Sequence, residues 1–173
     1  NLMAALAAGS WDGVKLAAGI TGLLVALLGV VGILDLVLVQ ITSPFAGWLG
    51  GEVLSLDRML SWVFTPFAWL LGVGNSDLNI AAQLLGKRLL LTEMVAYKQL
   101  GELAASQQVS SRTLLILSYA LCGFAHVASM GIFVGGISAL VPSRRDDLSA
   151  LALRALIGAT LATLMTGALA GLF

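Results

Sequence analysis

The chain has 173 residues, of which 59% are hydrophobic and 10% are charged, and its formal net charge at pH 7 is zero. Soluble domains carry about 25% charged residues, so the composition excludes an ordinary soluble protein and indicates an all-α integral membrane protein. The zero net charge gives no reason to expect a nucleic-acid partner. One cysteine and one histidine exclude an internal disulfide and a zinc cluster.

The first hydrophobic stretch predicts a transmembrane helix over residues 14–40. About 20 apolar residues are needed to cross a bilayer, and residues 16–34 carry no charge. Asp35, near the end of this stretch, is expected to reach the interface or to cap a neighbouring helix, and a ligand-binding role is the alternative. The proline and glycines between residues 42 and 51 predict a break before the next element.

Residues 54–71 predict a helix that lies along the membrane interface. Trp62 and Trp69 are seven residues apart and share one helical face, and tryptophan favours the headgroup level. Pro66 interrupts the segment, so a kinked transmembrane span is the alternative. We interpret the tryptophans as anchors rather than as the lining of a substrate path.

Residues 78–105 are too charged for a simple span and predict a re-entrant helical hairpin. Two short apolar pieces flank a polar stretch, and irregular backbone at membrane depth is tolerated only where protein or a water-filled cavity surrounds it. Thr92 and Glu93 would lie at or near the tip of this hairpin. Lys87 and Arg88 are expected to extend along the apolar surface and keep their charges in water.

The last two hydrophobic segments predict a discontinuous transmembrane helix over residues 113–141 and a final transmembrane helix over residues 148–173. The first is rich in small and polar residues in its interior. This pattern is typical of a helix that unwinds partway across the bilayer, where transporters place substrate contacts. In the loop before the hairpin, Asp77 is expected to cap the helix that follows it.

A lone acid, Glu93, stands among apolar residues of the hairpin. Because an ionisable group inside a membrane is costly, such a residue marks a functional site by default. The residues alone leave open a simpler interpretation, in which Glu93 is an interfacial charge paired with Arg88 or Lys98.

The segment around Glu93 resembles the signature of the concentrative nucleoside transporters. It reads Gly-Lys-Arg-Leu-Leu-Leu-Thr-Glu-Met-Val-Ala-Tyr from Gly86 to Tyr97, and the family has G-x-K-x3-N-E-F-V-A followed by an aromatic residue or Met. Arg88 stands where the family has Lys, and Thr92 stands where it has Asn.

A second segment resembles the same family. It reads Cys-Gly-Phe-Ala-His-Val-Ala-Ser-Met-Gly-Ile from Cys122 to Ile132, and the family has C-G-F-A-N-F-S-S-x-G-I. His126 stands where the family has Asn. The likeness covers nearly the whole chain but only the C-terminal half of a complete transporter.

The resemblance implies a scaffold helix, an interfacial helix, the second re-entrant hairpin, a discontinuous helix and a last scaffold span. It implies that the substrate, chiefly its ribose, faces four residues and the hairpin tip. These are Glu93, Phe124, His126 and Ser129, with Thr92 at the tip. It also implies a homotrimer in the plasma (inner) membrane, with the base-reading hairpin and most cation ligands outside this segment.

The function that the resemblance implies is secondary active transport, in which nucleosides are imported by symport with sodium or protons through alternating access. The alternative is a non-transporting nucleoside-recognition or gate-like membrane domain that acts in assembly or regulation. An enzyme is the weakest class, because no nucleophile–base pair, phosphate loop or metal cluster is evident, and no cofactor is indicated.

Among the departures from the family pattern, the replacement of Asn by His at position 126 changes the chemistry of the side chain most. Imidazole supplies a donor and an acceptor, as Asn does, but it also titrates near neutral pH. Our hypothesis is that His126 keeps the ribose contact and makes transport sensitive to protons. A packing histidine with satisfied hydrogen bonds is the alternative.

Overall fold

The computed structural model describes residues 1–45 and 53–173. In this part of the chain the elements are α1 (Leu2–Thr42), η1 (Ser43–Phe45), α2 (Leu56–Leu70), α3 (Leu78–Leu90), α4 (Glu93–Ala105), α5 (Ser111–Ala120), α6 (Val127–Leu140), η2 (Pro142–Arg144) and α7 (Arg145–Ala170). The predicted all-α fold class is confirmed. Gly47, Gly50 and Gly51 of the predicted break lie outside the described residues.

Helix α1 is much longer than the expected span of residues 14–40. It extends back to Leu2, through alanine-rich residues that favour a helix, and Asn1 accepts the Ala4 N–H at 2.8 Å. At 1.5 Å per residue a helix of this length measures about 60 Å. Since the hydrocarbon core of a bilayer is about 30 Å thick, α1 can stay within a membrane only with a strong tilt.

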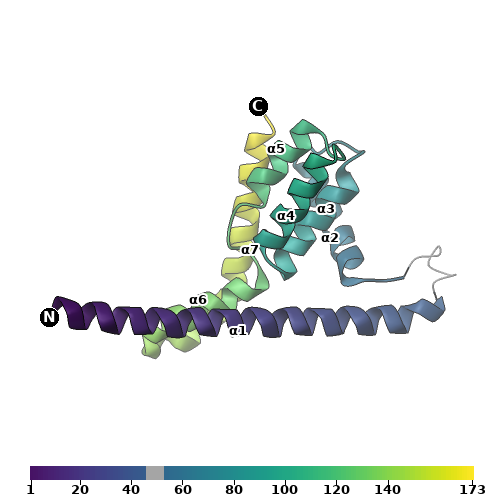
Figure 1. Ribbon diagram of the computed structural model, residues 1–173. Helices are drawn as coiled ribbons and strands as arrows, with labels where there is room; N and C mark the ends of the chain where they lie inside the picture. Colours follow the sequence, from purple (N-terminus) through teal and green to yellow (C-terminus); the bar gives the residue numbers. More distant parts are fainter. Residues whose placement is uncertain (46–52) are drawn as a thin grey trace.

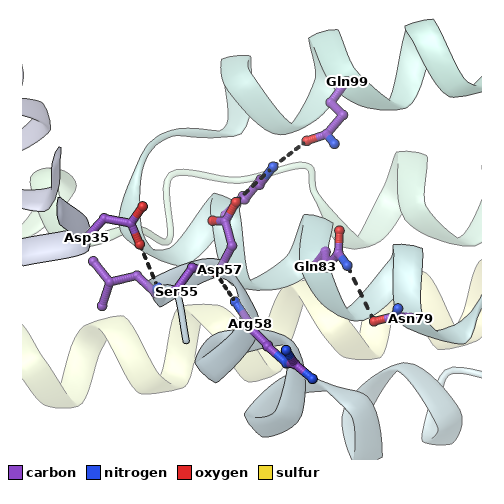
Figure 2. Close-up of polar contacts among 9 residues, drawn as sticks. Asp35, Ser55, Asp57, Arg58, Asn79, Gln83 and Gln99 are labelled. Carbon is purple, nitrogen blue, oxygen red and sulfur yellow. Dashed lines mark hydrogen bonds and ion pairs between the residues drawn. The ribbon is translucent and has the colours of Figure 1, made fainter. Parts of the chain in front are cut away.

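Figure 1 shows α1 lying across one end of the other helices, with α6 beside it. Asp35 of α1 joins it to the next element, because its carboxylate accepts the Leu56 N–H at the start of α2 at 2.8 Å (Figure 2). The predicted role of Asp35 as a cap for a neighbouring helix is therefore confirmed.

Helix α2 packs closely against α3. Its inner face buries Ser61, Phe64 and Ala68, while Trp62 and Trp69 are 57% and 62% exposed. The two tryptophans thus share the outer face, as an anchoring role requires. The position of α2 at a membrane interface stays a prediction.

Two pairs of short helices follow, and each pair is interrupted by a few non-helical residues. Leu91 and Thr92 separate α3 from α4, and residues 121–126 separate α5 from α6. Gly123 in the second break has a φ of 143°, which favours glycine. These breaks lie within the ranges predicted for the hairpin and the discontinuous helix, whose depth in a membrane stays a prediction.

The core lies between α2, α3, α4, α5 and α7. Its fully buried members include Ala81, Leu84, Leu85, Ile116, Leu117, Ala120 and Leu121. Helix α7 approaches α5 at Gly167, where a Cβ would lie only 2.7 Å from the Cβ of Ala120. By length and composition, α1 and the helical residues 142–170 are apolar enough to cross a membrane.

Asp77 does not cap α3 as expected. It occupies the N-cap position, but its side chain makes no capping bond to α3. Its carboxylate instead accepts the Ser110 N–H at 3.0 Å and the Ser110 hydroxyl at 2.8 Å, and Ser110 is the N-cap residue of α5. These bonds, led by the backbone N–H, lower the pKa of Asp77 to about 2. Asp77 therefore connects the starts of α3 and α5.

Candidate functional site

Glu93 is the first residue of α4 and lies beside the turn that separates it from α3. Its side chain is 18% exposed, and its Oε2 lies 3.2 Å from Nε2 of His126. The distance is that of an ion-pair contact, but no hydrogen bond to Oε2 is aligned. The contact brings the hairpin and the discontinuous helix together at their two breaks.

His126 is the N-cap residue of α6 and is almost fully buried. Its Nδ1 accepts the backbone N–H of Ser129 at 3.1 Å. An imidazolium has no acceptor nitrogen, so the ring in this geometry is neutral and carries its proton on Nε2. This Nε2 is the atom that lies 3.2 Å from Glu93 Oε2.

Ser129 completes a capping box with His126. Its hydroxyl donates to the His126 carbonyl oxygen at 2.6 Å and faces the His126 N–H at 3.3 Å. The hydroxyl hydrogen is thus already used inside the helix start. The imidazole ring itself is oriented by the backbone N–H of Ser129 rather than by this hydroxyl.

Phe124 and Thr92 lie at the edges of this cluster. Phe124 is 66% exposed, and its ring centroid lies 6.3 Å from that of His126. Together with Ser129 it borders an apolar groove of about 270 Å³ between α6 and α7. Thr92 is the N-cap residue of α4 and makes no side-chain capping bond, so its hydroxyl stands at the hairpin turn.

The expectation that Lys87 and Arg88 extend into water is wrong for Arg88, whereas the side chain of Lys87 stays partly exposed. Arg88 is only 2% exposed, and its Nη1 donates to the carbonyl oxygen of Ala120 at 2.7 Å. Lys87 lies between Asp57 of α2 and Gln99 of α4, with its Nζ 3.1 Å from an oxygen of each. Figure 2 shows Asp57 and Gln99 on the two sides of this contact.

Arg88 is thus a site residue that sequence reasoning missed. One signal was present, because Arg88 stands at the one basic position of the family signature around Glu93. The hydrophobic residues on both sides suggested a long side chain lying along lipid, whereas α5 provides a buried carbonyl acceptor for it.

The site therefore combines a carboxylate, a neutral imidazole and a buried guanidinium where two interrupted helical elements meet. Transporters that work by alternating access build their substrate sites from interrupted helices of this kind. The fold and the site are thus of the kind that secondary transporters have.

The comparisons with known proteins identify the family. The family model described as Na+ dependent nucleoside transporter C-terminus matches residues 1–171. The chain belongs to this family of integral, multi-pass membrane transporters.

Relatives from bacteria and mammals match nearly the whole chain. The Escherichia coli protein NupX is 36% identical over 174 residues, which cover 100% of this chain and 41% of NupX. Mouse sodium/nucleoside cotransporter 1 is 36% identical over 189 residues, which cover 99% of this chain and 28% of that protein. The chain therefore spans less than half the length of these relatives.

Solved structures of the transporter CNTnw share this fold at 34% sequence identity. A variant in an intermediate state, named intermediate 3, gives a TM-score of 0.88 and covers 100% of this chain and 42% of that chain. The structure of the inward-facing, substrate-bound state gives a TM-score of 0.78 and covers 99% of this chain and 41% of that chain. The arrangement of helices in this chain therefore agrees better with the intermediate state than with the inward-facing one.

Proposed function

We propose that this chain forms half of a secondary active transporter that imports nucleosides together with sodium ions or protons. The contact between Glu93 and His126 carries the proposal, because it joins the hairpin turn to the helix break at the place where a substrate would bind. Family membership supports the substrate class. The coupling-cation ligands are expected mostly outside this segment.

The chemistry of the cluster suits a ribose. The Glu93 carboxylate can accept two hydroxyl hydrogens, and bonds to a charged acceptor are the stronger kind. The Nε2–H of His126 can donate to a ribose oxygen. Phe124 offers an exposed apolar face, and the Thr92 hydroxyl lies at the edge of the site. The Ser129 hydroxyl closes the capping box at the start of α6, and its backbone N–H holds the imidazole in its tautomer.

The packing of α7 refines the implied mechanism of alternating access. The resemblance implies that α7 belongs to a stationary scaffold. The close approach of Gly167 to Ala120 instead favours movement of α7 together with α5, since so tight a contact leaves little room for the two helices to slide. We expect the hairpin, α5, α6 and α7 to move together relative to α1.

Nucleoside uptake by the full-length protein in proteoliposomes tests the proposal. We expect Glu93→Gln to reduce uptake about tenfold or more, because the amide keeps the shape but loses the charged acceptor. Glu102→Gln is the matched control, since Glu102 lies on the same helix and is exposed. Full retention of uptake in Glu93→Gln would contradict the assigned site. Binding without uptake in the wild type would support the gate-like alternative.

The protonation of His126 is tested by the pH dependence of uptake in wild type and His126→Asn. Asparagine is a good N-cap residue, so it can keep the bond to the Ser129 N–H while losing the contact with Glu93. A pH profile that flattens in the variant supports proton sensitivity at His126. Identical profiles would leave His126 as a packing and capping residue. The homotrimer is proposed from the resemblance alone and can be measured by the mass of the purified protein.

A further inference from the structure

The carboxyl end of α5 points into the break between α5 and α6, where its last carbonyl oxygens have no partners within the helix. Two of the last four accept backbone N–H groups from just beyond the helix. The other two accept side chains of the hairpin. The Tyr97 hydroxyl donates to Ser118 O at 2.6 Å, and Arg88 Nη1 donates to Ala120 O at 2.7 Å.

Arg88 is an unusual partner for this position. It is the largest of the fully buried side chains, and its Nε and Nη2 have no hydrogen-bond partner among the described residues. A buried guanidinium with unpaired N–H groups is costly unless an opposite charge compensates for it. The titratable groups that interact with it are Glu93, Tyr97 and Cys122, and of these Glu93 is the carboxylate.

The place that Arg88 occupies is one that suits a cation. The carboxyl end of a helix carries a partial negative charge, and transporters coordinate Na+ with the carbonyl groups of interrupted helices. Here that end of α5 already holds a positive charge supplied by the hairpin.

We propose that Arg88 is a built-in cation, which fills at the α5–α6 break the position of a bound coupling ion and holds the hairpin to the discontinuous helix while substrate binds. Arg88 is then a positioning residue for Glu93 rather than a substrate ligand. The proposal rests on the proposed transport function and concerns the same site. It implies that the loss of this one charge can be repaired by a small cation that donates hydrogen bonds.

Three substitutions in the full-length protein separate charge from volume. Arg88→Ala removes both and leaves a space, Arg88→Met removes the charge but keeps most of the volume, and Arg88→Lys keeps the charge. We expect about tenfold or greater loss of uptake in the alanine and methionine variants, since both remove the bond to Ala120 O and the positive charge that interacts with Glu93. The lysine variant should retain more, because only one N–H of Arg88 is bonded.

Chemical rescue of uptake by an added cation distinguishes a role of the Arg88 charge from a purely structural role, which an added cation would not restore. Millimolar guanidinium should raise the uptake of Arg88→Ala several-fold and leave Arg88→Met unchanged, because only the alanine variant has room for it. Tetramethylammonium at the same concentration controls for ionic strength, since it donates no hydrogen bonds. Lys87→Met controls for the loss of a neighbouring positive charge and should keep most of its uptake.

Several results would overturn the proposal. These are wild-type uptake in Arg88→Met, no rescue of Arg88→Ala, or equal rescue of both variants. If Arg88→Ala does not fold, uptake per folded Arg88→Lys must exceed that of Arg88→Met, and equal values would reject the built-in cation. If the wild type transports no nucleoside, the proposed function fails. The role of Arg88 can then be tested by thermal stability, because the proposal predicts a higher melting temperature of Arg88→Ala in guanidinium than in tetramethylammonium, and equal values would reject it.

Discussion

The contact between α2 and α3 gives a direct prediction about Gly86. A Cβ at this position would lie 2.7 Å from the Cβ of Leu60 and 3.4 Å from its carbonyl carbon. Carbon atoms normally pack at about 3.5–4.0 Å, so Gly86→Ala requires a shift of about 1 Å between the two helices. Because the contact is with a Cβ, no rotation of the Leu60 side chain can relieve it.

The expected cost follows from two opposing effects. Overpacking of this kind costs about 1–3 kcal/mol, and replacing a helical glycine by alanine recovers roughly 0.5–1 kcal/mol. The net loss of about 1–2 kcal/mol should lower the melting temperature of the detergent-purified protein by roughly 2–8 °C. The control is Gly101→Ala in α4, where no atom of the described residues lies within 4 Å of the added Cβ. Its melting temperature should be unchanged or higher. Equal melting temperatures for the two variants would refute the reasoning.

Two further predictions concern the supports of α5. Gly167→Ala should reduce both stability and uptake, because the new Cβ would lie 2.7 Å from that of Ala120. Gly158→Ala, on the exposed face of α7, should leave uptake unchanged and the melting temperature unchanged or higher in the same assays. The pKa of Asp77 is lowered from 3.8 to about 2, chiefly by the backbone N–H of Ser110, so its ionised form stabilises the folded protein above pH 3.8. That contribution is lost as the pH falls from 3.8 toward 2. The melting temperature of Asp77→Asn should therefore fall less over this range than that of the wild type, and parallel curves would contradict the assignment.

Much of the fold class and of the site could be predicted from local patterns. The lack of charge between residues 16 and 34 and the two motifs indicated helices, a membrane and a family. The motifs also pointed to Glu93 and His126, which the structure brings into contact across 33 positions of sequence. A motif carries such information because its residue types are tied to a known fold.

The features that could not be predicted depend on partners far along the chain. Arg88 is buried because a carbonyl group 32 residues away accepts its N–H, and Asp77 turns from its own helix because the donors of Ser110 lie 33 residues away. The hydropathy of the neighbouring residues gives no information about either of these long-range contacts. It led instead to the interpretation of Arg88 as a side chain that extends toward water.

The adjacent cations Lys87 and Arg88 show how one short motif serves two purposes. Successive residues of a helix point about 100° apart, so Lys87 reaches α2 and α4 while Arg88 reaches α5. The partner of Lys87, Asp57, is half exposed, and exposed ion pairs contribute only about 0–1 kcal/mol. Arg88→Met instead removes a buried hydrogen bond to the carbonyl oxygen of Ala120, and a hydrogen bond made by a charged group contributes about 1.5–3 kcal/mol. Arg88→Met should therefore be about 1–2 kcal/mol less stable than Lys87→Met, and equal losses would mean that Arg88 is solvated in the folded protein.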